Sequence, residues 1–132
     1  MESGGSRRMS AILDLTCEFF LEVAHHMPHF PEGHPNTRLH GHSYQGLVTL
    51  RGPIDPVSGT VMDIERVREK IKGMVDDLDH RYLNEIPGLE SPSSERLAVW
   101  IWNRLKPSIP QLIKVELKRP SIGMSVSYGG PL

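Results

Sequence analysis

The first part of the chain alternates between apolar and polar residues. In LDLTCEFFLEV (residues 13–23) the odd positions are apolar and the even positions are polar, apart from Phe20. Side chains two residues apart share one face of a strand, so the pattern predicts a half-buried strand. A second strand is predicted over residues 43–51, and it ends at the turn-forming pair Gly52-Pro53.

The pattern changes after a predicted turn at Ser58-Gly59 and a brief extended piece. From Asp63, a plausible helix N-cap, apolar residues recur every three or four positions and predict an amphipathic helix. These residues are Ile64, Val67, Ile71, Met74, Val75 and Leu78. A second helix is expected to begin near Ser93 and to end before Pro107. Its apolar face carries Leu97, Trp100, Ile101 and Leu105.

Two further alternating segments, LIKVELK (residues 112–118) and IGMSVSY (residues 122–128), predict strands. In the first of them Ile113, Val115 and Leu117 form the apolar set. The order ββααββ predicts an α+β fold in which two helices cover one face of a four-stranded antiparallel sheet. The other face and the sheet edges stay bare in a single chain, so we expect a homo-oligomer with sheets joined edge to edge.

The composition fits one domain over residues 11–132, preceded by a disordered arm over residues 1–10. The 132 residues are 38% hydrophobic and 23% charged. The single cysteine, Cys17, excludes an internal disulfide and favours a cytoplasmic location. A formal net charge of -1 gives no electrostatic footprint for nucleic acid. No apolar run is long enough to predict a membrane span.

Two alternating histidines stand out in HPNTRLHGHSYQG (residues 34–46). On a strand, His40 and His42 project from the same face, as two nitrogen ligands of a zinc ion would. His25 could supply a third ligand if the first two strands pair antiparallel, and His26 competes for that role. Three histidines would leave one coordination position open, which is typical of catalytic zinc. The alternative is that these are ordinary surface or hydrogen-bonded histidines at strand ends.

Asp79 and His80 follow the first predicted helix. An aspartate can orient an imidazole and stabilise its charged form, which makes a proton relay near neutral pH. The alternative is that the two residues cap or pair at the helix end.

Together these segments resemble the 6-pyruvoyl-tetrahydropterin synthase / 6-carboxy-tetrahydropterin synthase family, from about Leu15 to Gly129. The resemblance is carried by FLEVAHHMPH, PEGHPNTRLHGHSY, GTVMDIERV and LDHRYLNEIPGLESPSSERLAVWIW. It is closest to the bacterial branch that serves queuosine-type deazapurine synthesis. It implies the tunnelling fold, in which sheets join into a barrel as trimers that stack as hexamers.

The resemblance also implies site residues and a substrate. His25, His40 and His42 would bind catalytic Zn²⁺, and Asp79 and His80 would form the proton relay, supplied across a subunit boundary. The substrate would be 7,8-dihydroneopterin triphosphate or a related compound. Zinc would acidify its side-chain hydroxyls, and elimination of triphosphate with rearrangement or cleavage of the side chain would follow.

Two positions depart from the family pattern. Asn36 stands where the family has its proton-abstracting cysteine, and a carboxamide cannot exchange a proton near neutrality. Cys17 lies on the apolar parity of its strand, which favours core packing over a displaced catalyst. Arg119 stands where a glutamate anchors the pterin. A guanidinium has only donors, so it favours a carboxylate, phosphate or carbonyl-rich ligand, unless Arg119 only forms an exposed ion pair.

Three hypotheses follow from these residues. The first is a zinc-dependent lyase of the family, with Glu32 as the nearest replacement base; a variant is a lyase or hydrolase acting on an acidic substrate read by Arg119. The second is a zinc-loaded paralogue that binds a metabolite or a partner without catalysis. The third is a scaffold only, which leaves the histidines without a role.

Overall fold

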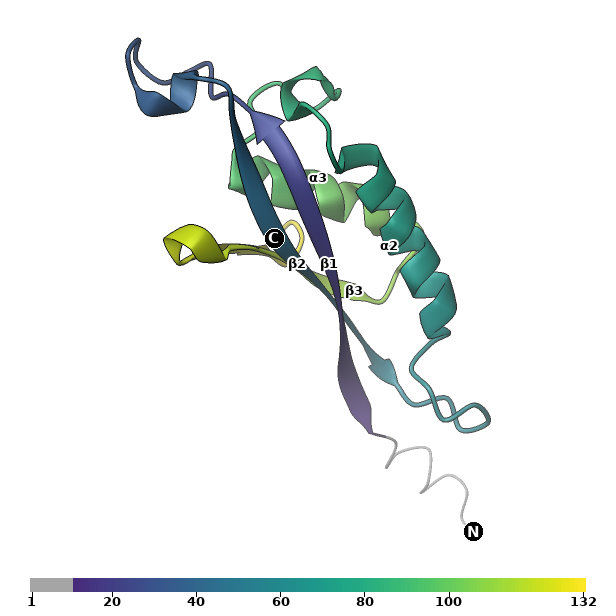
Figure 1. The fold of residues 1–132 in the computed structure, drawn as a ribbon. Coiled ribbons are helices and arrows are strands. Elements are labelled where there is room, and N and C mark those ends of the chain that lie inside the picture. Colours follow the sequence, from purple (N-terminus) through teal and green to yellow (C-terminus); the bar gives the residue numbers. More distant parts are fainter. Residues whose placement is uncertain (1–10) are drawn as a thin grey trace.

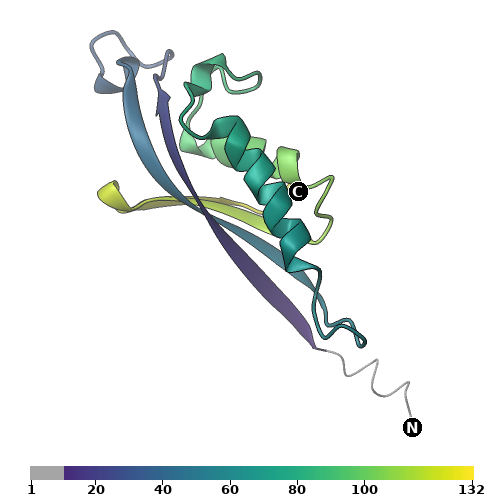
Figure 2. The ribbon, with the colours of Figure 1, turned by 45° about the vertical axis from the view of Figure 1, so that its right-hand side comes forward.

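The computed structural model describes residues 11–132, and the arm predicted over residues 1–10 lies outside the described residues. The main elements are β1 (Ile12–His25), β2 (His40–Pro53), α2 (Ile64–Leu78), α3 (Ser94–Leu105), β3 (Leu112–Arg119) and β4 (Met124–Tyr128). Short 3₁₀ turns are η1 (Pro35–Thr37), η2 (Leu83–Glu85) and η3 (Pro120–Ile122). The four strands form one antiparallel sheet in the order β1-β2-β3-β4, with both helices on the same side (Figures 1 and 2). The predicted α+β architecture is therefore confirmed.

β1 and β2 form a long hairpin whose pairing is continuous from Ile12↔Pro53 to His25↔His40. Both strands extend beyond their predicted ends, so they include the histidines. On β1 the odd residues from Phe19 onward face the helices, and on β2 the even residues from Tyr44 onward do so. The core-facing stripe therefore continues directly into the histidines at one end of the hairpin.

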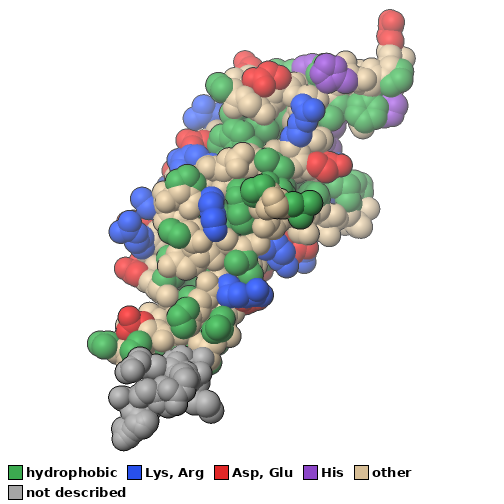
Figure 3. Space-filling view, turned by 180° about the vertical axis from the view of Figure 1, so that it is seen from behind, with side chains coloured by type: hydrophobic (Ala, Val, Ile, Leu, Met, Phe, Trp, Pro, Cys, Tyr) green, Lys and Arg blue, Asp and Glu red, His purple; other side chains and the backbone are tan. Residues whose placement is uncertain are grey.

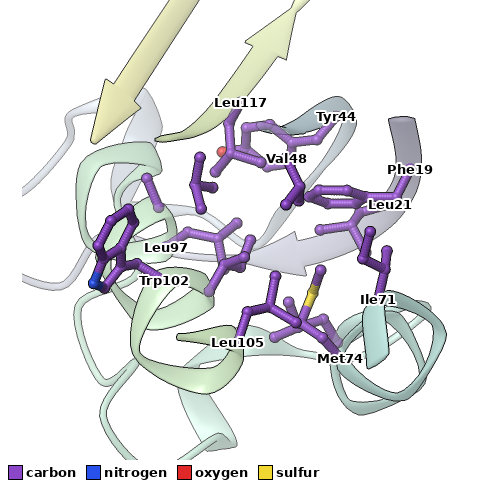
Figure 4. Packing of buried hydrophobic residues seen from close by; sticks show 14 of the residues in the cluster. Phe19, Leu21, Tyr44, Val48, Ile71, Met74, Leu97, Trp102, Leu105 and Leu117 are labelled. Atoms are coloured by element: carbon purple, nitrogen blue, oxygen red, sulfur yellow. The ribbon is translucent and has the colours of Figure 1, made fainter. Parts of the chain in front are cut away.

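The core lies between the sheet and the two helices (Figure 4). α2 contributes Val67, Ile71, Met74 and Leu78, and α3 contributes Leu97, Ala98, Ile101, Trp102 and Leu105. The predicted N-cap Asp63 is confirmed, since it accepts a hydrogen bond from Glu65 N. The second helix begins at Ser94 as expected, and Ser93 caps it by accepting a hydrogen bond from Arg96 N. None of the helices within residues 11–132 is long and apolar enough to cross a membrane.

Phe19 shapes the middle of the hairpin. It pairs with Gly46 across the strands, and the end of its ring occupies the space beside that glycine. A Cβ at position 46 would lie 2.0 Å from the Phe19 ring, so no larger residue fits there without displacing it. Glycine at this position lets a large aromatic side chain cover the backbone of the neighbouring strand.

The third strand differs from its prediction because of a bulge. The pairing of β2 with β3 shifts between Thr49 and Leu50, so that Leu50 pairs with Leu112. Leu112 is consequently buried, whereas Ile113 is only half-buried. The alternation that placed Ile113 in the core is wrong at this position, because a bulge inserts one unpaired residue and reverses the parity beyond it.

The last predicted strand is present but starts later than predicted, and the brief extended piece predicted after Ser58-Gly59 is absent. β4 begins at Met124 rather than at Ile122, since Pro120–Ile122 forms the turn η3 and Gly123 closes it at a φ of 64°. Proline restricts the backbone and lacks an N–H, which favours a turn over a strand start. Residues 60–62 form bends and no strand, although the turn predicted at Ser58-Gly59 is present.

Candidate metal centre and substrate cavity

Three histidines converge where β1 ends and β2 begins. Nε2 of His25 lies 3.0 Å from Nε2 of His40 and 2.7 Å from Nε2 of His42. One nitrogen from each ring lies within 4.8 Å of the other two. Nitrogen ligands of tetrahedral zinc lie about 3.3 Å apart, given Zn–N bonds of about 2.0–2.1 Å. The trio could therefore hold a metal ion with a small adjustment of the rings.

The far nitrogens of two rings are held by backbone carbonyls. Nδ1 of His25 donates to Pro92 O at 2.8 Å, and Nδ1 of His40 donates to Arg38 O at 2.6 Å. A neutral imidazole carries one proton, so both Nε2 atoms then present lone pairs to each other. Two lone pairs at this separation repel unless a cation or proton lies between them. The donor set therefore fits a metal ion, and the carbonyls fix the ring orientation as outer partners of metal sites do.

Burial keeps two members of the trio neutral. The pKa of His25, whose side chain is 4% exposed, is lowered mainly by burial. Burial also lowers the pKa of His42 to about 4, with further contributions from His25 and Arg119. Neutral imidazoles carry the lone pair that a metal requires, so these rings are available as ligands near neutral pH.

The trio opens onto a cavity of about 200 Å³. It is lined by His25, Met27, Phe30, Asn36, His40, His42, Ser93, Ser94, Glu95, Arg119 and Met124. These residues come from the ends of the four strands, from the loop after β1 with its turn η1, and from the start of α3. Figure 3 shows that the histidines on the face drawn there gather at one end of the molecule. The structure thus brings Asn36 and Arg119 into the cavity that the histidines form.

Arg119 is the one cationic side chain of this lining. It is half-buried at the end of β3 and forms no ion pair among residues 11–132. Its positive charge contributes to the lowered pKa values of His25 and His42. The exposed ion pair considered as an alternative for Arg119 is thus not formed within the described chain, and its guanidinium is available to a ligand.

Asp79 and His80 do not line this cavity, and they lie beside β1 on the edge opposite β2. Oδ1 of Asp79 accepts from Glu22 N at 2.8 Å, and its Oδ2 lies 2.9 Å from Nδ1 of His80. The pKa of Asp79 is lowered, chiefly by the Glu22 N–H. The side chain of His80 is 78% exposed and its backbone has a φ of 59°. The pair has the geometry of an oriented imidazole, but neither residue is among those that line the cavity of the trio.

The residues considered as an alternative metal ligand or as a replacement base lie outside the cavity. Nδ1 of His26 bonds to the hydroxyl of Tyr82, so His26 does not join the trio. Glu32 is exposed and absent from the cavity lining. Cys17 packs against the core eight residues before His25 on the same strand, which is roughly 26 Å at about 3.3 Å per residue. Burial raises the pKa of its thiol, as expected for a packing residue.

The first turn of α3 contributes site residues that the sequence did not reveal. Ser93, Ser94 and Glu95 line the cavity, and Glu95 is the only carboxylate among the lining residues. The hydroxyl of Tyr44 lies 2.7 Å from Oγ of Ser94, and both side chains are buried. Burial raises the pKa of Tyr44. The sequence shows that this helix begins with polar residues after a loop. It does not show that this helix start lies beside the three histidines.

The fold and the trio define an α+β protein with a candidate metal centre at the end of a long β-hairpin. Comparison with known proteins gives the family. The 6-pyruvoyl tetrahydropterin synthase family matches residues 14–130. The 6-carboxy-5,6,7,8-tetrahydropterin synthase of Synechocystis sp. is 41% identical over 106 residues, which cover 76% of this chain and 81% of that protein.

Other relatives extend the comparison. The dihydroneopterin monophosphate aldolase of Pyrococcus furiosus is 36% identical over 91 residues, which cover 69% of this chain and 75% of that protein. The solved structure of Caenorhabditis elegans 6-pyruvoyl tetrahydropterin synthase superposes with a TM-score of 0.82 at 26% identity, covering 92% of this chain and 98% of that one. The chain belongs to the 6-pyruvoyl tetrahydropterin synthase family of enzymes, and the resemblance is confirmed.

Proposed function

We propose that the chain is a zinc-dependent lyase acting on 7,8-dihydroneopterin triphosphate or a related dihydroneopterin phosphate. The observation that carries the proposal is the convergence of three imidazoles on one cavity in a member of this family. The Synechocystis relative is named for a 6-carboxy-tetrahydropterin product, and the Pyrococcus relative for a dihydroneopterin monophosphate. Both names support a pterin, and the second supports a phosphorylated side chain. A place in queuosine synthesis and a cytoplasmic location stay predictions.

His25, His40 and His42 would hold the zinc ion, with Pro92 O and Arg38 O orienting two of the rings. Zinc with three nitrogen ligands has an open position, and as a Lewis acid it would acidify a side-chain hydroxyl of the substrate. The chain's own part is to position the substrate beside that position, exclude water and move protons.

Proton transfer needs a group other than Asn36, because a carboxamide does not titrate in the relevant range. Asp79 would hold the proton on Nδ1 of His80 and leave its Nε2 free to accept one. Because neither residue lines the cavity of the trio in its own chain, we propose that the pair serves the cavity of a neighbouring subunit. Glu95 lines the cavity and replaces Glu32 as the candidate second base.

The size of the cavity supports a site completed by an oligomer. At about 200 Å³ it is smaller than the roughly 300–1,000 Å³ typical of small-molecule sites. Within residues 11–132, no element covers the sheet face opposite the helices, and no strand pairs with the outer edge of β4. We propose a homo-oligomer, a trimer or hexamer with the sheets joined into a barrel, in which a second subunit supplies the missing wall.

A second candidate function is favoured by Arg119. A half-buried guanidinium next to a bound dication would make the cavity strongly attractive to an anion. The chain would then act on, or only bind, an acidic or carbonyl-rich ligand in place of a pterin. In this version the zinc site is retained and the family's usual reaction is not.

The discriminating experiment combines metal analysis with two substrates. Purified protein is assayed for bound zinc and then incubated with dihydroneopterin triphosphate and with dihydroneopterin monophosphate, with the His42→Ala variant as control. Release of triphosphate, or of an aldehyde from the monophosphate, that is lost on chelation and in His42→Ala would support the lyase. Bound zinc without turnover of either compound would favour the second candidate. Protein that binds no zinc would overturn the proposal.

Activity in the double variant Asn36→Cys/Arg119→Glu separates the remaining cases. If natural protein is inactive and this variant turns over the triphosphate, the cavity can support the family's reaction and the natural ligand is a different one. If both are silent, Asn36 and Arg119 do not occupy the positions that the family pattern assigns to the cysteine and glutamate.

A further inference from the structure

Residues 80–84, here called the edge segment, run parallel to the end of β1. His80 N donates to Glu22 O at 2.7 Å, and Ala24 N donates to Arg81 O at 3.1 Å. Ala24 and Tyr82 form a parallel β-bridge. The backbone pairing stops there, so His26, the first residue after β1, needs hydrogen-bond partners from another source.

The side chain of Asn84 supplies both of them. Its Oδ1 accepts from His26 N at 3.0 Å, and its Nδ2 donates to His26 O at 2.9 Å. One carboxamide thereby reproduces the donor and acceptor of a paired strand residue. The second Nδ2 proton is directed to Glu90 O at 3.3 Å. The amide orientation is fixed by these contacts, because a flipped group would face two carbonyls with its oxygen.

These hydrogen bonds act on both the backbone and the ring of His25. His26 is the residue directly after it, so the clamp on His26 fixes the backbone from which the His25 ring projects. Glu90 belongs to the loop that also carries Pro92, whose carbonyl orients Nδ1 of His25. Asn84 therefore ties the ligand's backbone to the loop that sets the ligand's ring.

We infer that Asn84 is a positioning residue for the metal centre and that its side chain helps set the affinity of the site for zinc. The inference rests on the proposed function, since it assumes that the trio binds zinc. Outer-shell partners of metal ligands typically change metal affinity by about 10–100-fold when removed. Asn84 touches no ring of the trio, so its effect would be transmitted entirely through His26 and the loop at Glu90.

A matched control is available at the other end of α3. Lys106 Nζ also bonds two backbone carbonyls, Pro110 O at 2.7 Å and Leu112 O at 2.9 Å. Lys106 follows the last residue of the 12-residue helix α3, whose first turn borders the cavity, so it lies roughly 18 Å away at about 1.5 Å per residue. Lys106→Met therefore removes two comparable bonds without touching the metal site.

The test measures zinc dissociation constants by competition with a chromophoric chelator, on the full chain, for natural protein, Asn84→Ala and Lys106→Met. We expect Asn84→Ala to weaken zinc binding by about 10–100-fold and Lys106→Met to leave it within about twofold. The visible spectrum of cobalt-substituted protein should change in Asn84→Ala and stay unchanged in Lys106→Met. If Asn84→Ala does not fold, Asn84→Asp, which keeps the acceptor for His26 N and loses both donors, is measured in its place.

The outcomes separate this inference from the proposed function. Unchanged zinc affinity and cobalt spectrum in the Asn84 variant overturn the inference and leave the zinc site standing. Equal weakening in Asn84→Ala and Lys106→Met also overturns it, because the effect would then reflect general stability. Natural protein that binds no zinc overturns both.

Discussion

The buried bond between Tyr44 and Ser94 links the core to the cavity and gives a quantitative test of the structure. Tyr44 is 2% exposed and Ser94 is 6% exposed, and their oxygens are 2.7 Å apart. Tyr44→Phe removes one hydroxyl and leaves Oγ of Ser94 buried without its partner. An orphaned buried hydroxyl costs about 1–3 kcal/mol of unfolding free energy, and Ser94→Ala should cost a similar amount by orphaning the phenol.

The double variant Tyr44→Phe/Ser94→Ala removes both groups and leaves no orphan. Its loss of stability should therefore fall short of the sum of the single losses by about 1–2 kcal/mol. The single variants should each lower Tm by roughly 3–6 °C per kcal/mol for a chain of this size.

Urea titration of metal-free protein, followed by the fluorescence of Trp100 and Trp102, measures all four proteins, and equal m-values confirm that only stability has changed. Strict additivity of the two single losses would refute the reasoning, because it would mean that the two hydroxyls do not depend on each other.

Three further predictions test other parts of the molecule. Gly46→Ala should cost about 3 kcal/mol or more, because the new methyl group displaces the Phe19 ring from the core, and a loss below 1 kcal/mol in urea titration would contradict this packing. Cys17→Ser should keep any lyase activity within about twofold in a kinetic assay, and a hundredfold loss would make Cys17 the proton-transfer group. The pKa of Asp79 is lowered in the folded protein, so its contribution to stability is present above the unfolded carboxyl pKa of about 3.9 and lost as pH falls through the folded value. Asp79→Asn should therefore flatten the acid decline of unfolding free energy below about pH 4, and parallel profiles in the two proteins would argue against the bond to Glu22 N.

Much of the fold followed from local patterns because those patterns report which face is buried. The alternation from Leu13 to Val23 fixed the parity of β1, and His25 shares that parity, so its side chain faces the same layer as the core. Asp63 and Ser93 predicted where the two helices begin, because a side-chain oxygen just before the first turn accepts hydrogen bonds from its free backbone N–H groups.

The features that sequence did not give depend on contacts between distant segments. The bulge that buries Leu112 instead of Ile113 arises from pairing with β2, which periodicity within one strand cannot reveal. The cavity position of Glu95 and the clamp by Asn84 depend on how loops return to the end of β1. Local propensity does not reveal where a loop packs against a distant strand. For the same reason it could not predict where His80 lies relative to the trio.

The histidines of the cavity lie on strands, whereas Asn36 and Arg119 lie in or next to turns. This difference affects how such a protein can change its substrate in evolution. The imidazoles project from a hairpin whose pairing is continuous over its whole length, so shifting one of them would disturb the entire ladder. Asn36 sits in the turn η1, and Arg119 is the last strand residue before the turn η3. Side chains at these two positions can be exchanged at little structural cost, so new substrates can be sampled while the framework of three histidines is inherited intact.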